Sequence, residues 1–459
     1  MKPKHEWYKK KGYLHFDYAL TRLEAEQFVQ SPQNIIRNHR FSPLIYYKKS
    51  TKKVKRDRAA EMRYKQGGHP KPKLIVTKKD RNIFYCSHVD GYIYSFYNFE
   101  ISKKYNQLLT SLNIENNIIA YRTIKNNGVK YCNIHFAKEV FEFIQQKKDC
   151  KVICLDLSNF FDSLCTTILK RNWERVIGVN RLPDDHYKIY NSLINFTYVD
   201  EDCIIDKFGE RFENNPRNHG LDKDSGGSSK NKICSYIELN KVIKHSKNSE
   251  APFLKDKSNF KNFTGIPQGT PLSGLLSNIF MLNFDESISS YAKNIGAMYR
   301  RYSDDIILVL PTDTDFNKAI EFISSELNKN CGSGIQINPK KTEKRIVNYK
   351  LDHFEVTDEN GKESKVQYLG LVFDRGGITL RNSTVSKDRA KIVSLIRANK
   401  KGKGKINTLK VFKDKSSRKI TKYNESRNKG YIFYSERAHE AHSALSKINK
   451  QASKNDKFI

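Results

Sequence analysis

Apolar and polar residues along the chain follow two kinds of pattern, which together predict a mixed α/β protein. Runs of β-branched and leucine residues at 152–155 and 306–310 have the length of buried strands. Elsewhere, apolar residues three and four positions apart predict helices. The expected helices cover most of 101–147, about 163–176, 271–293 behind Thr270 and Pro271, 316–327, and most of the tail from about 383.

Polar and glycine-rich stretches separate these elements. Residues 74–98 alternate in strand fashion, and the polar segment Lys78–Arg81 is expected to be a hairpin turn within them. Residues 184–200 have the spacing of a helix followed by a strand. The glycines and prolines of 67–72 predict a linker or a cluster of turns. The polar segment 206–262 is expected to be a surface insertion or a partly mobile loop.

Basic residues concentrate at the two ends of the chain. The net charge of the 459 residues is +33. Residues 1–80 carry 21 Lys and Arg against 7 Asp and Glu, and residues 381–459 carry 22 against 6. General solubility charge, from an AT-rich genome that favours lysine, would explain the abundance of lysine but not this segregation. The pattern favours a nearly neutral catalytic middle with nucleic acid bound at both ends.

The cysteines and the apolar runs argue against several other classes of protein. The eight cysteines are scattered and form no repeated C-x-x-C pair, so a zinc site is not expected. No run has the length of a bilayer-spanning helix, and the polar start Met1–Trp7 is not typical of a targeting segment. We therefore expect a cytoplasmic protein with reduced thiols and no membrane partner.

Three carboxylates are placed where strands end. Asp304 and Asp305 precede the 306–310 run, and Asp156 ends the run that begins at Val152. An isolated acid pair is usually turn chemistry. Several carboxylates at one sheet edge, however, form a hard oxygen cage that suits Mg²⁺. Two such ions about 3.5–4 Å apart are the device of polymerases and nucleases.

Five motifs in order make the sequence resemble a reverse transcriptase. They are Asp156–Asp162, Gly265–Asn278, Tyr302–Asp305, Asn338–Glu343 and Gln367–Leu371. Lys79–Arg81 with Asp90, and Ala120–Arg122, resemble the fingers region more loosely. The resemblance implies a right-hand polymerase with fingers, an α/β (α+β) palm and a helical thumb.

The resemblance also suggests domain boundaries. We expect a basic N-terminal extension at 1–75, fingers at 76–150, a palm at 151–375 that contains the 206–262 insertion, and a basic helical thumb at 376–459.

Within bacterial relatives, the Pro-Gln-Gly and Leu-Ser-Asn pieces of the second motif look like the group II intron and retron lineages. The stretch between Asp156 and Gly265 is longer than a compact retron enzyme would need. Together with Leu182–Tyr187, this length looks more like the defence-associated (abortive-infection and unknown-group) reverse transcriptases. That subfamily implies antiphage function and a cognate noncoding RNA.

The resemblance assigns the metal-binding and acid–base roles. Asp156, Asp304 and Asp305 would hold two Mg²⁺ ions, with Mn²⁺ as a possible substitute, and the Leu157 carbonyl would complete one coordination sphere. Lys341 is the candidate general acid for pyrophosphate release, or a charge that neutralises it. Its neighbour Lys340 is the alternative.

Residues for nucleotide and primer binding follow in the same way. Phe161 lies five residues after Asp156, where its ring would exclude a 2′-hydroxyl, while Phe160 is expected in the core. The acid Asp162 comes one place later than in RNA-dependent RNA polymerases. The other candidates are Gln268 and Gly269 for the nucleotide pocket, Arg81 as a triphosphate clamp or an exposed turn arginine, and Tyr368 and Gly370 for the primer or for a plain hairpin.

The sequence thus predicts an RNA-directed DNA polymerase that adds dNTPs to a primer 3′-hydroxyl on an RNA template and makes a DNA product. One alternative is a template-independent or protein-primed DNA polymerase of a defence system. An alternative of another class is a maturase-like splicing scaffold that binds RNA.

Overall fold

In the computed structural model, the described residues are 7–56, 58–66, 74–126, 128–209, 232–247, 252–375, 377–386, 390, 437–440 and 442. They divide into two compact units, each built from three stretches of chain. The first unit comprises Met1–Asn113, Asn159–Asn283 and Asn330–Ile335, and the second comprises Ile114–Ser158, Phe284–Lys329 and Gln336–Ile459. The expected linker at 67–72 and nearly all of the basic tail lie outside the described residues.

The first unit combines helices with a small sheet. Its helices are α1 (Arg22–Val29), α2 (Arg58–Lys65), α3 (His88–Ser111), α5 (Thr166–Ile177), α6 (Asp184–Ile194), α7 (Glu201–Phe208), α9 (Tyr236–Ser246) and α10 (Ser273–Phe280), with short helical turns at Asn34–Asn38, Phe160–Ser163 and Lys257–Asn259. Its strands are β1 (Leu44–Arg56), β2 (Leu74–Tyr85), β6 (Thr197–Asp200) and β7 (Lys255–Asp256).

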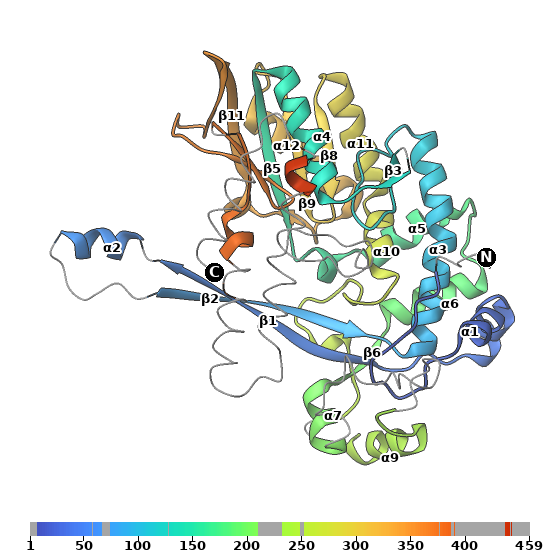
Figure 1. Ribbon diagram of the computed structural model, residues 1–459. Coiled ribbons are helices and arrows are strands. Elements are labelled where there is room, and N and C mark those ends of the chain that lie inside the picture. The colour runs from blue at the N-terminus through green and yellow to red at the C-terminus, as the bar shows by residue number, and fades with distance from the viewer. Residues whose placement is uncertain are drawn as a thin grey trace, which may run out of the picture. The chain divides into compact units, whose positions relative to one another are not determined.

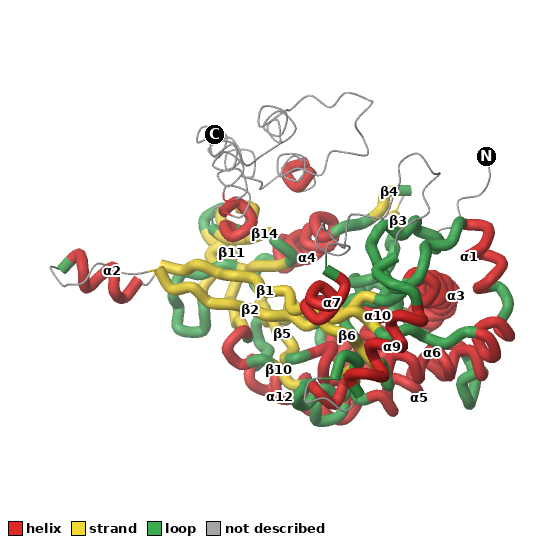
Figure 2. Tube along the Cα trace, turned by 90° about the horizontal axis from the view of Figure 1, so that it is seen from below, coloured by secondary structure: helices red, strands yellow, loops and turns green. Residues whose placement is uncertain are grey.

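The strands of this unit form one sheet in the order β2-β1-β6-β7. Most of β1 and β2 extends beyond β6 as a long two-stranded antiparallel ribbon, with α2 at its far end (Figure 1). Seen from below, the two strands run side by side toward β6 (Figure 2). At the base of the ribbon the buried ring of Phe84 contacts Tyr46, Phe196 and Tyr198. Aromatic packing therefore anchors one end of the ribbon.

The second unit contains a larger sheet and a separate β-meander. Its helices are α4 (Asn133–Lys147), α11 (Leu282–Asn294, nearly all in this unit) and α12 (Phe316–Cys331), with a short 3₁₀ turn at Pro339–Lys341. Its strands are β3 (Lys125–Asn126), β4 (Val129–Lys130), β5 (Cys150–Ser158), β8 (Met298–Tyr302), β9 (Asp305–Leu310), β10 (Gln336–Ile337), β11 (Glu343–Lys350), β12 (His353–Thr357), β13 (Val366–Tyr368), β14 (Leu371–Asp374) and β15 (Gly377–Leu380).

The larger sheet has the strand order β12-β11-β5-β9-β8, and β10 pairs with the end of β5. Neighbouring strands in this order are antiparallel. Its central strands are buried on both faces, since Val152 and Ile153, which point to opposite sides, are both inaccessible to solvent. This explains why β5 and β9 read as continuous apolar runs.

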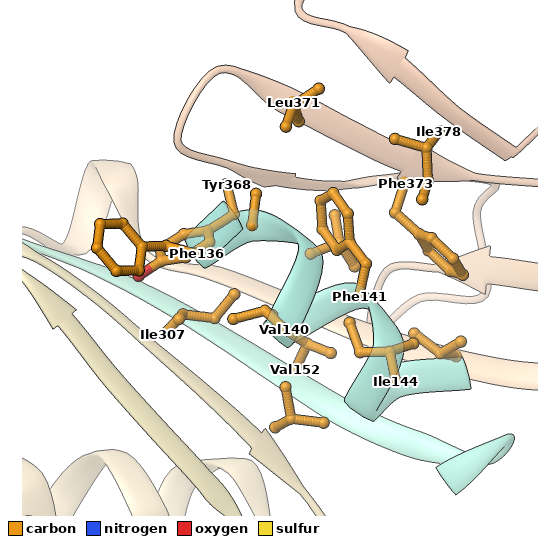
Figure 3. Packing of buried hydrophobic residues seen from close by; sticks show 14 of the residues in the cluster. Phe136, Val140, Phe141, Ile144, Val152, Ile307, Tyr368, Leu371, Phe373 and Ile378 are labelled. Atoms are coloured by element: carbon orange, nitrogen blue, oxygen red, sulfur yellow. The ribbon is translucent and has the colours of Figure 1, made fainter. Parts of the chain in front are cut away.

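Helix α4 lies between this sheet and the β13–β14–β15 meander (Figure 3). Its residues Val140 and Ile144 belong to one buried cluster with Val152 of β5, and Phe141 meets Phe373 of β14 at 5.6 Å between ring centroids. The cluster spans helix, sheet and meander, and it makes a rigid support for the strand ends described below.

The α/β fold class expected from the sequence is confirmed, as are the helix-then-strand pattern at 184–200 and the helix at 316–327. The prediction of a turn at Lys78–Arg81 is wrong. These residues lie inside β2, which pairs with β1 over its whole length. Polar residues occur there because the ribbon is exposed on both faces, not because the chain reverses.

Other expectations about elements need correction. Residues 88–98, expected in strands, form the first part of α3. The helical stretch predicted over 101–147 is interrupted between α3 and α4 by turns and the short β3–β4 hairpin. Helix α10 begins after Leu272, and α11 follows it directly, so 271–293 is two helices and Thr270 does not cap the first. The Thr270 hydroxyl instead hydrogen-bonds that of Ser273 at 2.5 Å.

The 206–262 segment is not all loop. Residues 210–231 and 248–251 lie outside the described residues, but α9 between them is a regular helix. The Ser235 hydroxyl accepts from the Glu238 amide while the Glu238 carboxylate accepts from the Ser235 amide. This capping box fixes the start of the helix, and Leu239, Val242 and Ile243, at helical spacing, pack it into a buried cluster.

Candidate active site

The register of β5 against β9 places two of the predicted acids opposite each other. Asp156 pairs with Asp305 across the two strands. Tyr302 pairs with Asp305 across β8 and β9, so Ser303 and Asp304 form a two-residue turn between these strands. The Leu157 amide donates to the Asp304 carbonyl at 3.1 Å and ties the turn to β5. The structure thus brings Asp156, Asp304 and Asp305 to one edge of the sheet.

Partial burial and like charges make one carboxylate at this edge difficult to ionise. The pKa of Asp305 is raised to about 6, first by partial desolvation and then by the like charges of Asp304 and Asp156. Lys341 and Arg381 act in the opposite direction. A carboxylate whose neighbours make it difficult to ionise gains most from a bound cation.

One of the two candidate lysines places its ammonium group against these carboxylates. The Lys341 ammonium forms an ion pair with the Asp156 carboxylate, whereas the described contact of Lys340 runs through its backbone amide to the Asn338 side chain at 3.2 Å. The Asn338 amide donates to the Asp156 carbonyl at 2.8 Å, so the 3₁₀ turn that carries both lysines is fastened to β5. The geometry distinguishes Lys341 from Lys340, which the sequence alone could not do.

The donor set at this edge fits a hard divalent cation, because carboxylate oxygens are what Mg²⁺ prefers. The unfavourable clustering of Asp156, Asp304 and Asp305 also matches what a metal site requires. Within the described ranges, however, no group of three or more His, Cys, Asp or Glu is already arranged as a metal cage.

The first unit holds the predicted nucleotide-pocket loop. The amides of Thr264 and Gly265 both donate to the Asp162 carbonyl at 2.9 Å, and the Ile266 amide donates to the Phe161 carbonyl at 3.2 Å. A Cβ on Gly265 would lie 1.9 Å from the Phe161 carbonyl oxygen, so no other residue fits there. Backbone hydrogen bonds and close packing therefore fix the loop against the Phe161 segment.

Phe160 and Phe161 differ in burial as expected, but for another reason. Phe160 is buried and Phe161 is half-buried, with their rings 5.5 Å apart and nearly perpendicular. The expectation that they alternate on a strand is wrong, because β5 ends at Ser158 and Asn159 adopts a left-handed conformation before a 3₁₀ turn. The turn separates the two rings.

Gln268 and Gly269 lie against the base of the ribbon. The Phe84 amide donates to the Gln268 carbonyl at 2.9 Å. Gly269 has φ of +126°, and a Cβ there would lie 2.3 Å from the Phe84 carbonyl oxygen. Arg81 is exposed on β2, three residues from Phe84 and directly opposite Lys49 of β1. It is a strand residue, not the turn residue that the sequence suggested.

Tyr368 is placed differently from Gly370. Its side chain is buried within the cluster of Figure 3 and its hydroxyl has no hydrogen-bond partner within the described residues. Leu369 and Gly370 form the turn of the β13–β14 hairpin, with φ of +45° and +91°. Tyr368 therefore packs in the core, whereas Gly370 lies in the hairpin turn.

Residues 233–373 match the family model described as "Reverse transcriptase (RNA-dependent DNA polymerase)". The chain carries a reverse transcriptase domain. The chain is 29% identical over 133 residues to the retron Ec86 reverse transcriptase of Escherichia coli. The aligned residues make up 29% of this chain and 35% of that protein. It is 32% identical over 111 residues to the retron Ec83 reverse transcriptase of the same organism. The aligned residues make up 23% of this chain and 36% of that protein. The matches thus span about a third of these relatives.

Solved structures with some similarity to the chain include two telomerases. Apo telomerase from Candida tropicalis, truncated from its C-terminal domain, matches with a TM-score of 0.38 and 18% identity over 66% of this chain and 52% of that one. Telomerase from Candida albicans in complex with a TWJ fragment of telomeric RNA matches with a TM-score of 0.35 and 11% identity. The match covers 79% of this chain and 52% of that one.

The family match confirms the predicted reverse transcriptase resemblance and its right-hand polymerase class, and the class implies a divalent metal cofactor. The matched range includes Asp304, Asp305 and Lys341 but begins after Asp156 and Phe161. The strand register nevertheless places Asp156 opposite Asp305, which lies inside the matched range. No described helix of the chain is both long and apolar enough to cross a membrane.

Sequence reasoning overlooked one feature of the reverse transcriptase domain. Arg301 follows Arg300 in the sequence and looks like a second exposed basic residue, yet its side chain is fully buried against Asp285. The available signal was the strand alternation of 298–302, which places position 301 on the same face as the buried Tyr299.

Proposed function

We propose that this protein is an RNA-directed DNA polymerase of the retron-like bacterial lineage. The observation that carries the proposal is the register that sets Asp156 opposite Asp305, beside Asp304 and Lys341, in a chain with a reverse transcriptase domain. The substrates are dNTPs, and the product is DNA copied from an RNA template.

The three carboxylates would hold two Mg²⁺ ions, with the Leu157 carbonyl as a further ligand and Mn²⁺ as a substitute. When bound, such ions activate the primer 3′-hydroxyl and stabilise charge on the α-phosphate and the pyrophosphate. Lys341 neutralises Asp156 before substrate enters. It would then either donate a proton to the departing pyrophosphate or neutralise part of its negative charge.

The first unit supplies substrate selection. The partly exposed Phe161 ring acts as a steric barrier to a 2′-hydroxyl, and its attachment to the Gly265–Ile266 backbone keeps it in register with the pocket loop. Gln268 and the close-packed Gly269 let the backbone of that loop approach the nucleotide. The turn at Leu369–Gly370 is the proposed contact for the primer end.

The exposed basic residues of the β1–β2 ribbon are evidence for an RNA partner. Lys49 lies opposite Arg81, and Lys52 opposite Lys78, although like charges directly across a strand pair are destabilising. By strand alternation Lys49, Lys79 and Arg81 share one face, and all three are exposed. A polyanion laid along this basic ribbon face would relieve the repulsion, so we assign it the RNA backbone.

We further propose that the template is a cognate noncoding RNA and that the protein acts in antiphage defence in the cytoplasm. The support is the similarity to retron reverse transcriptases and the resemblance of its motifs to the defence-associated lineage. Phage plating efficiency on cells expressing the wild type should fall at least tenfold relative to cells expressing Asp304→Asn/Asp305→Asn. Equal plating would remove the defence role and leave the enzyme activity unaffected.

The experiment that tests the enzyme activity is sequencing of nucleic acid that co-purifies with the wild type and with an Asp304→Ala/Asp305→Ala variant. One RNA in both samples, with complementary DNA only in the wild type, would establish templated synthesis. DNA without an RNA counterpart would instead indicate untemplated or protein-primed synthesis. RNA in both samples with DNA in neither would favour a splicing scaffold.

A further inference from the structure

A buried ion pair contacts the turn that carries two of the proposed catalytic acids. The side chains of Arg301 on β8 and Asp285 on α11 are both fully buried. Arg301 Nε donates to Asp285 Oδ1 at 2.7 Å and Nη2 donates to Oδ2 at 2.6 Å, which is a bidentate arrangement. The Tyr299 hydroxyl also donates to Asp285 Oδ1, at 2.7 Å.

Stability alone does not account for this pair. Desolvating two charges offsets most of their attraction, and apolar side chains of similar volume often stabilise a core at least as well. The surrounding core offers such packing, since Ile288 and Leu308 are fully buried. The ion pair therefore calls for a role that apolar side chains could not fill.

The guanidinium has a third contact that suggests this role. Arg301 Nη1 donates to the Ser303 carbonyl at 3.0 Å. Ser303 is the first residue of the turn between β8 and β9 and has φ of +61°, a conformation that favours glycine. The Tyr121 hydroxyl lies 3.3 Å from the Ser303 hydroxyl. A non-glycine residue in this conformation persists only where its surroundings hold it.

The next peptide of the turn is held by β5, because the Leu157 amide donates to the Asp304 carbonyl. The carbonyls before and after Asp304 are thus both fixed, one by β5 and one by Arg301. Asp285 in turn fixes the guanidinium with two hydrogen bonds and cancels its charge. The contribution of Arg301 to the acids is then geometric more than electrostatic.

We propose that Asp285 and Arg301 are positioning residues that hold the strained Ser303 turn and so align Asp304 and Asp305. The proposal rests on the polymerase function proposed above and names two residues that its chemistry requires without contacting substrate. The fork of arginine is needed because lysine cannot hold Asp285 bidentately and reach Ser303 at the same time.

The test compares Arg301→Lys with Arg300→Lys. Arg300 is the matched control because it is the adjacent residue of β8 and pairs with Glu139 at 3.6 Å, without a described contact to the turn. Primer extension by Arg301→Lys should show kcat reduced about 10- to 100-fold, with the KM for dNTP changed less than threefold. Arg300→Lys should stay within threefold of wild type in both constants.

A second substitution separates positioning from folding. Ser303→Gly accepts positive φ without outside support, so adding it to Arg301→Lys should restore kcat at least fivefold. If the arginine only stabilised the fold, the glycine would restore nothing, and kcat per folded molecule would already be normal in Arg301→Lys. Either of these results would overturn the proposal.

A readout that needs no polymerisation keeps the proposal separate from the function on which it rests. Mn²⁺ binding, followed by electron paramagnetic resonance, should weaken about tenfold in Arg301→Lys, recover in the double variant and stay unchanged in Arg300→Lys. Equal Mn²⁺ affinity in all variants would refute the positioning role. Failure of the wild type to extend any primer, with this Mn²⁺ pattern intact, would refute the proposed function alone.

Discussion

At the scale of single residues, the proposed active site depends on differences between neighbours that look equivalent in the sequence. Phe160 and Phe161 are adjacent rings, yet one is core and the other is half-exposed beside the pocket loop. Lys340 and Lys341 are adjacent lysines, yet only the second reaches Asp156 among the described contacts. Each pair therefore provides a test with a built-in control.

Phe161→Ala should relax discrimination against ribonucleotides, because the ring that would clash with a 2′-hydroxyl is removed. We expect the ratio of kcat/KM for dNTP over rNTP to fall at least tenfold in primer extension. The control is Phe160→Leu, which replaces a buried ring and should lower stability while sugar selection is retained. Unchanged selection in Phe161→Ala would sink the steric role.

Lys341→Ala should reduce kcat about 100-fold, within the usual range for loss of a general acid, while Lys340→Ala should change it less than threefold. The physical reason is that only the Lys341 ammonium lies among the acids of the sheet edge. Single-turnover incorporation of one dNTP would measure both. Equal losses in the two variants would mean that the lysines act only as diffuse positive charge.

At the scale of elements, the pocket loop and the basic ribbon act as units. Gly269 packs against the Phe84 carbonyl, so the loop fits only while no side chain stands between them. Gly269→Ala should raise the KM for dNTP at least tenfold. The matched control is Gly296→Ala, which also has positive φ (+65°) but no atom within 4 Å of the added Cβ. Similar effects in both would indicate backbone strain alone.

The ribbon gives an element-scale prediction about RNA. Replacing Lys49, Lys79 and Arg81 by serine should weaken RNA binding and flatten the dependence of log K on log salt by about 2, since each single-strand phosphate contact contributes about 0.7. Replacing Lys293, Lys318 and Lys329, three exposed lysines of the second unit, removes the same charge. An equal flattening in this control would show that net charge, not the basic ribbon face, binds the RNA.

At the scale of the whole molecule, buried titratable groups couple folding to pH. His15 is fully buried, and its Nδ1 accepts from the Phe16 amide at 2.8 Å. Burial lowers the pKa of His15 to about 3, against the partial opposition of Asp17. The folded state therefore keeps this imidazole neutral where the unfolded chain takes up a proton.

The sign of the pH effect follows from this difference. Below about pH 6.5 the unfolded state binds more protons, so stability should fall as pH decreases, by about 2 kcal/mol at pH 5 from His15 alone. Denaturant unfolding followed by fluorescence would report it, because Trp7 and Trp173 both lie in the first unit. His15→Asn should remove this part of the slope, and the exposed His245→Asn should not. An unchanged slope in His15→Asn would contradict the assignment.

Much of the molecule could be predicted from local sequence pattern. The β5 and β9 runs, the order of the motifs and the acids at strand ends are short-range features, and the structure contains them where expected. The apolar pattern was informative because strands buried on both faces read as continuous apolar runs. It failed at Lys78–Arg81, where an exposed ribbon has no apolar face to mark it as a strand. At α9, within the polar 206–262 segment, the pattern is present, since Leu239, Val242 and Ile243 have helical spacing and pack into one buried cluster.

By itself, the sequence determined which chemical groups are available: three carboxylates, two candidate lysines, a glycine-rich loop and a segregated positive charge. Tertiary structure decided which of them meet. The partner of Asp156 depends on strand register, and the choice of Lys341 depends on how a 3₁₀ turn is fastened to β5. The burial of Arg301 against Asp285 joins a strand to a helix that lies earlier in the chain. Such contacts arise from packing between distant segments, and no local pattern of residues specifies them.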